Sequence, residues 1–238
     1  MPPKLHSFGI SDIGLLRSNN EDVWGIVSEK RFFVLADGMG GHNAGEVAAL
    51  LTLQSMCSSI ALLKAAPTTE EACQALRKAV AQANAKVLHE ARRYAEYSGM
   101  GTTLSCFIVL EKALIYAHVG DSRVYRFRSA LEQLTEDHSL YNTPLFKKEE
   151  GAAPARNVIT RAIGAQPTIH PDIGVIPFNS KDIYMICSDG LSDYVEESRI
   201  ARLLASPLPL EEKGKKLVAA ALEKGGNDNI TLLLVQVH

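Results

Sequence analysis

The chain has 238 residues, of which 46% are hydrophobic and 22% are charged, and its formal net charge is −2. This composition is that of a globular protein, and the length is enough to bury a sizeable core. The small net charge provides no overall attraction to nucleic acid or to an anionic membrane, so we expect neither as a partner.

The first half of the chain predicts three strands followed by two helices. Short apolar runs indicate the strands, at residues 7–13, 23–27 and 32–36. Residues 44–63 are almost free of charge, but they are too polar and too short to span a membrane, so we interpret them as a buried helix. A second helix begins near Thr69, where Thr68 and Glu71 have the spacing of a capping box, and it ends before Ser98.

The second half predicts strands joined by hairpins and a further pair of helices. The strands are expected at residues 103–110, 114–119, 124–128, 183–187 and 230–237, and the helices at 196–204 and 210–223. Residues 136–164 have weak periodicity, which indicates a loop or flap. Lys213, Lys215 and Lys216 are expected on a solvated helix face. Hairpin-linked strands with separate helix pairs favour mainly antiparallel sheet in a single domain over residues 1–238.

The cysteines Cys57, Cys73, Cys106 and Cys187 do not have the close spacing of a zinc site or redox motif. Cys106 and Cys187 lie in apolar runs and are expected in the core. No apolar signal-like segment follows the first residues of the chain. We therefore expect reduced thiols and a cytoplasmic protein.

Four aspartates stand in turns next to apolar runs: Asp37, Asp121, Asp189 and Asp228. Turn or helix-capping chemistry explains any one of them. Four along the whole chain predict carboxylates that converge on hard metal ions such as Mg²⁺ or Mn²⁺. Gly38, directly after Asp37, lets the backbone approach closely and offers its carbonyl oxygen as a further ligand.

Arg17 lies just ahead of an acidic cluster that contains Glu21 and Asp22. The fork of an arginine side chain suits a pair of phosphate oxygens, which indicates a phosphorylated substrate. The alternative is a surface salt bridge from Arg17 to Glu21 or Asp22. Such salt bridges are common and contribute little to stability.

The spacing of other residues excludes several enzyme classes. No cysteine has an arginine six positions later, which excludes a cysteine phosphatase of the C-x5-R kind. The chain also lacks the G-x-x-x-x-G-K-[ST] phosphate loop, the H-E-x-x-H zinc motif and the G-x-S-x-G nucleophile turn.

An ordered set of motifs covers nearly the whole chain: residues 11–14, 17–22, 36–42, 101–104, 119–123, 137–139, 157–164, 188–193 and 226–231. These motifs, in this order, resemble the type 2C, or PPM, family of metal-dependent serine/threonine protein phosphatases. The compact length and the methionine Met39 after Asp-Gly resemble the bacterial branch of that family.

The resemblance implies a set of metal ligands. The Asp37 position bridges two Mg²⁺ or Mn²⁺ ions, and the Gly38 position gives a backbone carbonyl to the first. The Asp189 and Asp228 positions hold the second ion. Bacterial relatives often bind a third ion at the positions of Asp121 and Asp189.

The resemblance also implies roles around the metals. Glu21 and Asp22 match acids that hold metal-bound waters, and Arg17 matches the residue that grips the substrate phosphate. A metal-activated water attacks phosphorus in line, while the metals and Arg17 neutralise the phosphoryl charge.

The proton donor to the leaving oxygen is less clearly implied. Met39 stands where some relatives have a histidine, so we expect a metal-bound water to donate the proton. His42 is the rival acid, although its spacing favours a structural role in the glycine turn. His118 is expected as a core residue, and His138 as a residue that orders the start of the flap.

The implied fold class is α+β, with two mostly antiparallel sheets packed as a sandwich, flanked by helix pairs, and a metal site at one end between the sheets. The implied function is hydrolysis of phosphoserine and phosphothreonine in proteins, with substrates of a Hanks-type kinase as partners and a monomeric state. One alternative is a non-catalytic family member that binds phosphoproteins. The other is a hydrolase of small phosphoesters.

Overall fold

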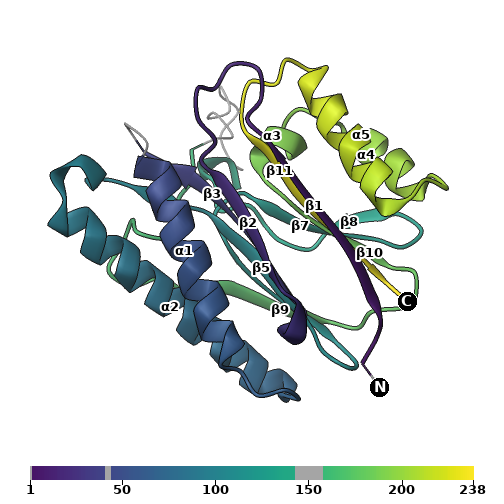
Figure 1. Cartoon of the computed structure of the whole chain (residues 1–238), viewed down its shortest axis with the longest axis horizontal. Helices are drawn as coiled ribbons and strands as arrows, with labels where there is room; N and C mark the ends of the chain where they lie inside the picture. Colours follow the sequence, from purple (N-terminus) through teal and green to yellow (C-terminus); the bar gives the residue numbers. More distant parts are fainter. Residues whose placement is uncertain (1, 41–43, 143–157) are drawn as a thin grey trace.

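The computed structural model describes residues 2–40, 44–142 and 158–238, which form two antiparallel sheets covered by helices (Figure 1). The first sheet has the strand order β1 (Leu5–Asp12), β11 (Ile230–Val237), β10 (Ile183–Cys187), β7 (Arg123–Phe127), β8 (Leu131–Gln133). The second has the order β2 (Asp22–Val27), β3 (Phe32–Met39), β5 (Leu104–Val109), β6 (Leu114–Val119), β9 (Asp172–Ile176), with β4 (Gly101–Thr102) also paired to β3. Every one of these strand pairs is antiparallel.

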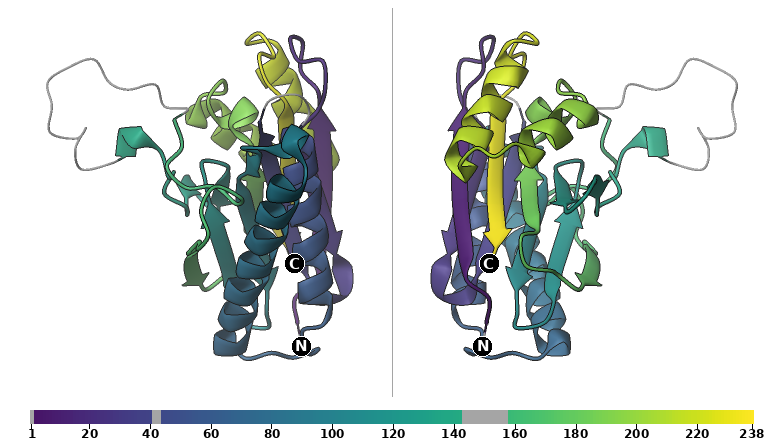
Figure 2. Two further views of the ribbon diagram at one scale, coloured as in Figure 1. Left: turned by 90° about the vertical axis from the view of Figure 1, so that its left-hand side faces the viewer. Right: turned by 90° about the vertical axis from the view of Figure 1, so that its right-hand side faces the viewer.

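Helices cover the outer faces of both sheets. Helices α1 (Ala44–Ala61) and α2 (Thr69–Arg93) pack on the second sheet, and α4 (Glu197–Ala205) and α5 (Leu210–Leu222) pack on the first. The two opposite views of Figure 2 bring first one helix pair and then the other to the front. A single turn, α3 (Asp189–Ser192), follows β10, and short 3₁₀ turns lie at Ser28–Lys30, Ala95–Tyr97 and Leu140–Asn142. The predicted α+β sandwich is therefore confirmed.

The space between the sheets is filled by large apolar side chains. Phe107 is completely buried there, with its ring centroid 5.1 Å from that of Phe33 and 5.9 Å from that of Tyr184. Strands β3 and β11 are buried on both faces, because helices cover one side and the opposite sheet covers the other. Double burial explains why both read as continuous apolar runs in the sequence.

The capping box at the start of α2 is confirmed. The Thr68 hydroxyl accepts a hydrogen bond from the Glu71 amide at 3.2 Å, and the Glu71 carboxylate accepts one from the Thr68 amide at 2.7 Å. These bonds satisfy amides that the first helical turn leaves unpaired.

Some predicted elements differ from the structure. The sequence does not predict β4, β8 and β9, which are short, and β8 and β9 are edge strands with exposed residues. The strand predicted at residues 32–36 continues to Met39, because Asp37 pairs with Asp22 of β2, and Gly38 and Met39 pair with β4.

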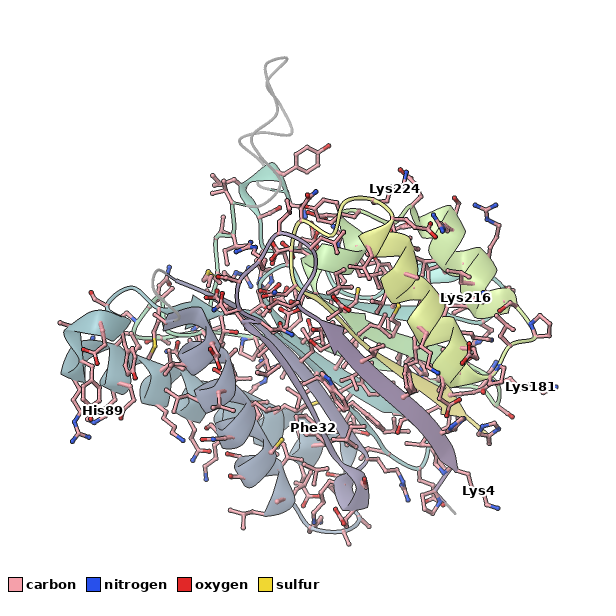
Figure 3. The ribbon with its side chains drawn as sticks, turned by 45° about the horizontal axis from the view of Figure 1, so that its top comes forward. Lys4, Phe32, His89, Lys181, Lys216 and Lys224 are labelled. Carbon is pink, nitrogen blue, oxygen red and sulfur yellow. The ribbon has the colours of Figure 1, made fainter. Side chains whose placement is uncertain are left out.

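The prediction of a solvated lysine face on α5 is wrong for Lys213. Its side chain is buried, and its ammonium group donates a hydrogen bond to the Leu204 carbonyl at 2.6 Å. Lys215 and Lys216 are exposed as predicted, and Figure 3 shows Lys216 on the outer side of the helix. Lys213 thus joins α5 to the end of α4 through the Leu204 carbonyl, which the helix terminus leaves without a partner inside the helix.

The two ends of the predicted flap lie against each other. Residues 138–140 pair with residues 158–160, through a bridge between Ser139 and Ile159 and a 2.8 Å bond from the Leu140 amide to the Val158 carbonyl. We call these two segments the stem. Residues 143–157, the rest of the predicted flap, lie outside the described residues, as does His42.

The remaining predictions concern membranes and thiols. None of the helices described is both long and apolar enough to cross a bilayer. The four cysteines are all described and form no disulfide. Cys106 and Cys187 are buried as predicted, and burial raises the pKa of each thiol to about 12.

We predict that Phe107→Ala lowers the free energy of unfolding by about 3–5 kcal/mol, because it leaves a cavity between the two sheets. Leu62→Ala is the control, since Leu62 is 88% exposed and its loss should change stability by less than about 0.5 kcal/mol. Denaturant unfolding of both variants checks this. Equal effects would contradict the assignment of Phe107 to the main core.

Candidate active site

A polar pocket of about 260 Å³ opens where strand ends of the two sheets meet. Its lining comes from the loop between β1 and β2, the end of β3, the link between β4 and β5, the turn after β6, the stem, the start of α3 and the loop before β11. The lining residues are Arg17, Glu21, Asp37, Gly38, Met39, Gly40, Thr103, Asp121, Ile159, Asp189, Asp228 and Asn229. The structure thus brings together all the predicted site residues except Asp22, which does not line the pocket.

Asp37 is held by hydrogen bonds on both sides of its backbone. Its amide donates to the Thr103 hydroxyl at 3.1 Å, and its carbonyl accepts from the Thr102 hydroxyl and the Thr103 amide, each at 2.8 Å. The prediction that Asp37 lies in a turn after the strand is wrong, because the residue belongs to β3 itself. A strand position gives the carboxylate a fixed direction, which a turn would not.

Gly38 is required by the close approach of helix α1. A Cβ atom at this position would lie 2.2 Å from the Gly45 carbonyl oxygen. The Gly38 amide also donates to the Glu21 carbonyl at 3.1 Å, which ties β3 to the acidic loop. Glycine therefore allows the start of α1, the Glu21 loop and the Asp37 backbone to meet at the pocket.

Asp189 and Asp228 come from adjacent parts of the first sheet. Asp189 is the first residue of α3, and a Cβ atom on the following Gly190 would lie 1.9 Å from the Asn229 carbonyl oxygen. Glycine at that position lets α3 pack directly on the loop that carries Asp228. The two carboxylates therefore line one pocket, Asp189 from the start of α3 and Asp228 from the loop before β11.

Asp121 lies in the turn after β6, between two tightly held neighbours. The Ser122 hydroxyl lies 2.5 Å from the Thr103 hydroxyl, and the Ser122 carbonyl accepts from Ser105 at 2.7 Å. Thr103 thus contacts both the Asp37 backbone and the Asp121 turn. The sequence places Thr103 in a motif but does not reveal this role, which depends on its neighbours in space.

Asn229 is a second functional residue that sequence reasoning missed. Its side-chain oxygen accepts from the Glu21 amide at 2.8 Å, and its side-chain nitrogen donates to the carbonyls of Ile13 at 2.9 Å and Asn19 at 3.0 Å. One amide side chain thus holds the 13–21 loop against the loop of Asp228. Its position directly after Asp228 is the signal that could have identified it.

Arg17 forms an ion pair with Asp228, with Nη2 2.7 Å from Oδ2. The alternative of a salt bridge to Glu21 or Asp22 is therefore wrong. The guanidinium side chain is 48% exposed, so the pair lies at the mouth of the pocket and is only partly shielded from water.

Asp22 lies behind the pocket and not in its lining. It is buried, pairs in register with Asp37, and accepts a hydrogen bond from the Ser188 hydroxyl at 2.8 Å. Burial, together with repulsion from Asp228, raises the pKa of its carboxyl to about 6.

Three aspartates of the pocket lining also have raised pKa values. Burial, followed by repulsion from Asp22, Asp189 and other carboxylates, raises the pKa of Asp37 well above its usual value. Burial and the neighbouring Asp121 and Asp228 do the same to the pKa of Asp189. Burial, with Asp137 and Asp193 nearby, raises the pKa of Asp121 to about 7.

The donor set of the pocket fits hard divalent cations. Its lining contains five carboxylates, from Glu21, Asp37, Asp121, Asp189 and Asp228, against the single cationic side chain of Arg17. Among the described residues, no three acidic, histidine or cysteine side chains lie close enough together to hold one ion in their present positions. Oxygen ligands in excess of positive charge are what Mg²⁺ and Mn²⁺ bind.

Comparison with known proteins agrees with this geometry. The family model of protein phosphatase 2C matches residues 17–225. The chain belongs to the protein phosphatase 2C family. It is 36% identical to the serine/threonine phosphatase stp of Listeria monocytogenes, over 98% of this chain and 96% of that protein. It is 34% identical to the protein phosphatase PhpP of Streptococcus pneumoniae, over 96% of each.

Solved structures show the same fold. The serine/threonine phosphatase of S. agalactiae has a TM-score of 0.91 and 34% identity, covering 99% of this chain and 100% of that one. The phosphatase PstP/Ppp of Mycobacterium tuberculosis has a TM-score of 0.89 and 32% identity, covering 98% and 99%. The predicted family and the predicted class of activity, a metal-dependent protein serine/threonine phosphatase, are thereby confirmed.

The described histidines of this protein phosphatase 2C chain lie outside the pocket lining. His118 is buried in β6 with Nδ1 3.0 Å from the Ser105 hydroxyl, as expected of a core residue. His138 lies at the start of the stem, where its amide donates to the Gly120 carbonyl at 2.7 Å. The prediction that His138 orders this segment agrees with that bond.

We predict that the metal-free protein loses stability as the pH rises through about 6 to 7. The pKa values of Asp22, raised to about 6, and Asp121, raised to about 7, lie above those of an unfolded chain. Their contribution to stability is therefore complete below the ordinary carboxylate pKa and is lost as they ionise in the folded state.

Thermal melting between about pH 5 and pH 8, with chelator or with saturating Mn²⁺, measures this effect. The melting temperature should fall with pH only in chelator, and Mn²⁺ binding near neutral pH should release protons. A melting temperature that does not fall with pH in chelator would contradict the repulsion between the buried carboxylates.

Proposed function

We propose that this pocket is the active site, where the chain hydrolyses phosphoserine and phosphothreonine in phosphorylated proteins with the help of Mg²⁺ or Mn²⁺. The observation that carries the proposal is that five carboxylates and Arg17 line one pocket in a member of the protein phosphatase 2C family. The acids supply metal ligands, and the arginine supplies donors for a phosphate.

The proposed ligand roles are those that the resemblance to the protein phosphatase 2C family implies, and the pocket lining contains the residues that would fill them. Asp37, the Gly38 carbonyl, Asp189 and Asp228 would hold two ions, with Asp37 between them, and Asp121 with Asp189 would hold a third. Glu21 lines the pocket and would hold bound water. Asp22 would have the same role from outside the lining, beside Asp37 on the neighbouring strand. When bound, such cations lower the pKa of water and neutralise charge that develops on phosphoryl oxygens.

Arg17 would bind the substrate phosphate after exchanging its present partner. Its guanidinium is occupied by the Asp228 carboxylate, and a dianionic phosphate is a stronger acceptor once that carboxylate has a cationic partner. The half-exposed position of Arg17 allows this exchange without moving the backbone. Arg17 then orients the phosphorus for in-line attack and offsets negative charge in the transition state.

The leaving oxygen needs a proton, and the described lining contains no histidine to supply it. Met39 reaches the pocket, but its thioether has no proton to donate. Water held among the pocket carboxylates is our proposed donor.

The partners that we propose are phosphorylated proteins, among them substrates of a Hanks-type kinase, for a monomeric cytoplasmic enzyme. The acidic lining disfavours nucleic acid, whose phosphates would meet several carboxylates and one arginine. A non-catalytic phosphoprotein-binding role is disfavoured because none of the expected ligands is missing. Small phosphoesters remain the second candidate, since Arg17 recognises only a phosphate.

The decisive assay is phosphate release from pSer, pThr and pTyr peptides with Mn²⁺ and with chelator. We expect pSer and pThr turnover that chelation abolishes and that Asp37→Asn lowers by more than about 100-fold, because a central metal ligand is lost. Glu70→Gln makes the matched change of carboxylate to amide on the exposed face of α2 and should have no effect. Turnover that survives chelation would refute the proposal.

Two exposed leucines in the loop before Arg17 allow a test of whether the substrate is a protein or a small phosphoester. Leu15 is 65% exposed and Leu16 is 72% exposed. Exposed leucines beside the pocket are suited to contact with a protein substrate, so replacing both by serine should raise KM for phosphopeptides by roughly 10-fold. Turnover of p-nitrophenyl phosphate should not change. Leu62→Ser, at an exposed leucine directly after α1, is the control. An equal loss with both substrates would favour the small-phosphoester alternative.

A further inference from the structure

The turn that carries Asp121 is held from behind by His138. The Gly120 amide donates to His138 Nδ1 at 3.1 Å, and the His138 amide donates to the Gly120 carbonyl at 2.7 Å. Gly120 has φ +108°, and a Cβ atom there would lie 2.7 Å from Thr103 Cβ. Both polar backbone groups of the residue before Asp121 are therefore bonded to one histidine residue.

These bonds fix the tautomer of the ring. Because Nδ1 accepts from Gly120, the ring hydrogen is on Nε2, which lies 3.1 Å from Asp172 Oδ2 and donates to it. Arg161 Nη1 donates to the other oxygen of Asp172 at 2.8 Å. Arg161 Nη1 also lies 3.2 Å from His138 Nε2, and because an arginine nitrogen can only donate, this contact with the protonated Nε2 is a close approach of two donors and not a hydrogen bond. The side chain of His138 is 5% exposed, so water has little access to its bond with the Gly120 amide, whereas the Asp172 side chain is 51% exposed.

The same histidine also bonds to the second segment of the stem, residues 158–160. Its carbonyl accepts a hydrogen bond from the Thr160 amide at 2.7 Å, and Ile159, directly before Thr160, lines the active-site pocket. The ring packs on His118, with the centroids 4.7 Å apart. His138 therefore joins the second segment of the stem, residues 158–160, to the Asp121 turn.

The other side of Asp121 has its own support. Ser122 is bonded to Thr103 and Ser105, so its position does not depend on His138. Only the Gly120 side can rotate if the histidine bond is lost, and that rotation would turn the Asp121 carboxylate within the pocket. Displacements of about 1 Å at a catalytic site can cost about 100-fold in rate, so a small rotation matters.

We propose that His138 is a positioning residue for Asp121, acting through the Gly120 amide, and that Asp172 fixes the ring tautomer this requires. The inference rests on the metal-binding role proposed for Asp121. His138 touches neither substrate nor ion; it sets the direction from which the Asp121 carboxylate meets a cation.

Two substitutions separate the two bonds of the ring. The side-chain oxygen of His138→Asn replaces Nδ1 and can accept from Gly120, but it does not reach Asp172. The side-chain amide of His138→Gln replaces Nε2 and can donate to Asp172, but it leaves the Gly120 amide unpaired. Asp121→Asn is the reference for loss of the carboxylate itself.

The readouts are Mn²⁺ titration calorimetry, hydrogen exchange of the Gly120 amide and the melting temperature. We expect His138→Gln to weaken the weakest Mn²⁺ site by roughly 10-fold and to accelerate Gly120 exchange, while His138→Asn stays close to wild type in both. The Mn²⁺ concentration for half-maximal turnover should rise in parallel for the glutamine variant.

Each outcome decides between the roles. If the two variants lose Mn²⁺ affinity equally, or if His138→Gln binds Mn²⁺ as wild type does, the inference is overturned and the histidine is only a packing residue. If His138→Gln does not fold, His138→Asn still decides, because loss of its Mn²⁺ affinity would refute the inference. If Asp121→Asn leaves every Mn²⁺ site unchanged, the metal role proposed for Asp121 has failed, and the inference fails with it.

Discussion

Mutual repulsion between carboxylates that share one pocket is the constraint around which this molecule is built. Asp37, Asp121 and Asp189 are drawn from three separate parts of the chain, and burial makes each of them costly to ionise. Holding such groups together without a cation destabilises the fold, and the apolar packing of two sheets between two helix pairs offsets that cost. The apolar core is therefore needed to keep the acidic pocket together.

Neutral side chains carry out much of the positioning. Thr103 bonds the Asp37 backbone and the Asp121 turn, and Asn229 holds the 13–21 loop against the loop of Asp228. Such groups add no charge to a site that already has an excess of it, and each forms bonds in more than one direction. Support of this kind holds the acidic side chains in place at a lower electrostatic cost than further ionic partners would bring.

The sequence predicts the parts of this design that are local. Apolar runs identify β3, β10 and β11, and the aspartates at the ends of these runs identify acids that line the pocket. The edge strand β9 escapes prediction because it is short and half exposed. The prediction that Lys213 is solvated is wrong because the Leu204 carbonyl, which accepts a hydrogen bond from Lys213, belongs to another helix. Likewise, Arg17 finds Asp228 and not its neighbours Glu21 and Asp22, since the partner lies 211 residues away in sequence. Partner choice across the fold is set by tertiary packing, which no local pattern encodes.

The ion pair between Arg17 and Asp228 has a thermodynamic consequence. One carboxylate serves both as a proposed metal ligand and as the partner of the phosphate-binding arginine. Cation binding at Asp228 and anion binding at Arg17 each remove the other's competitor, so the two events must be positively coupled. Linkage makes such coupling reciprocal: whatever factor the cation adds to phosphate affinity, phosphate adds to cation affinity. Inorganic phosphate, the product of the reaction, would therefore strengthen the binding of a cation at Asp228.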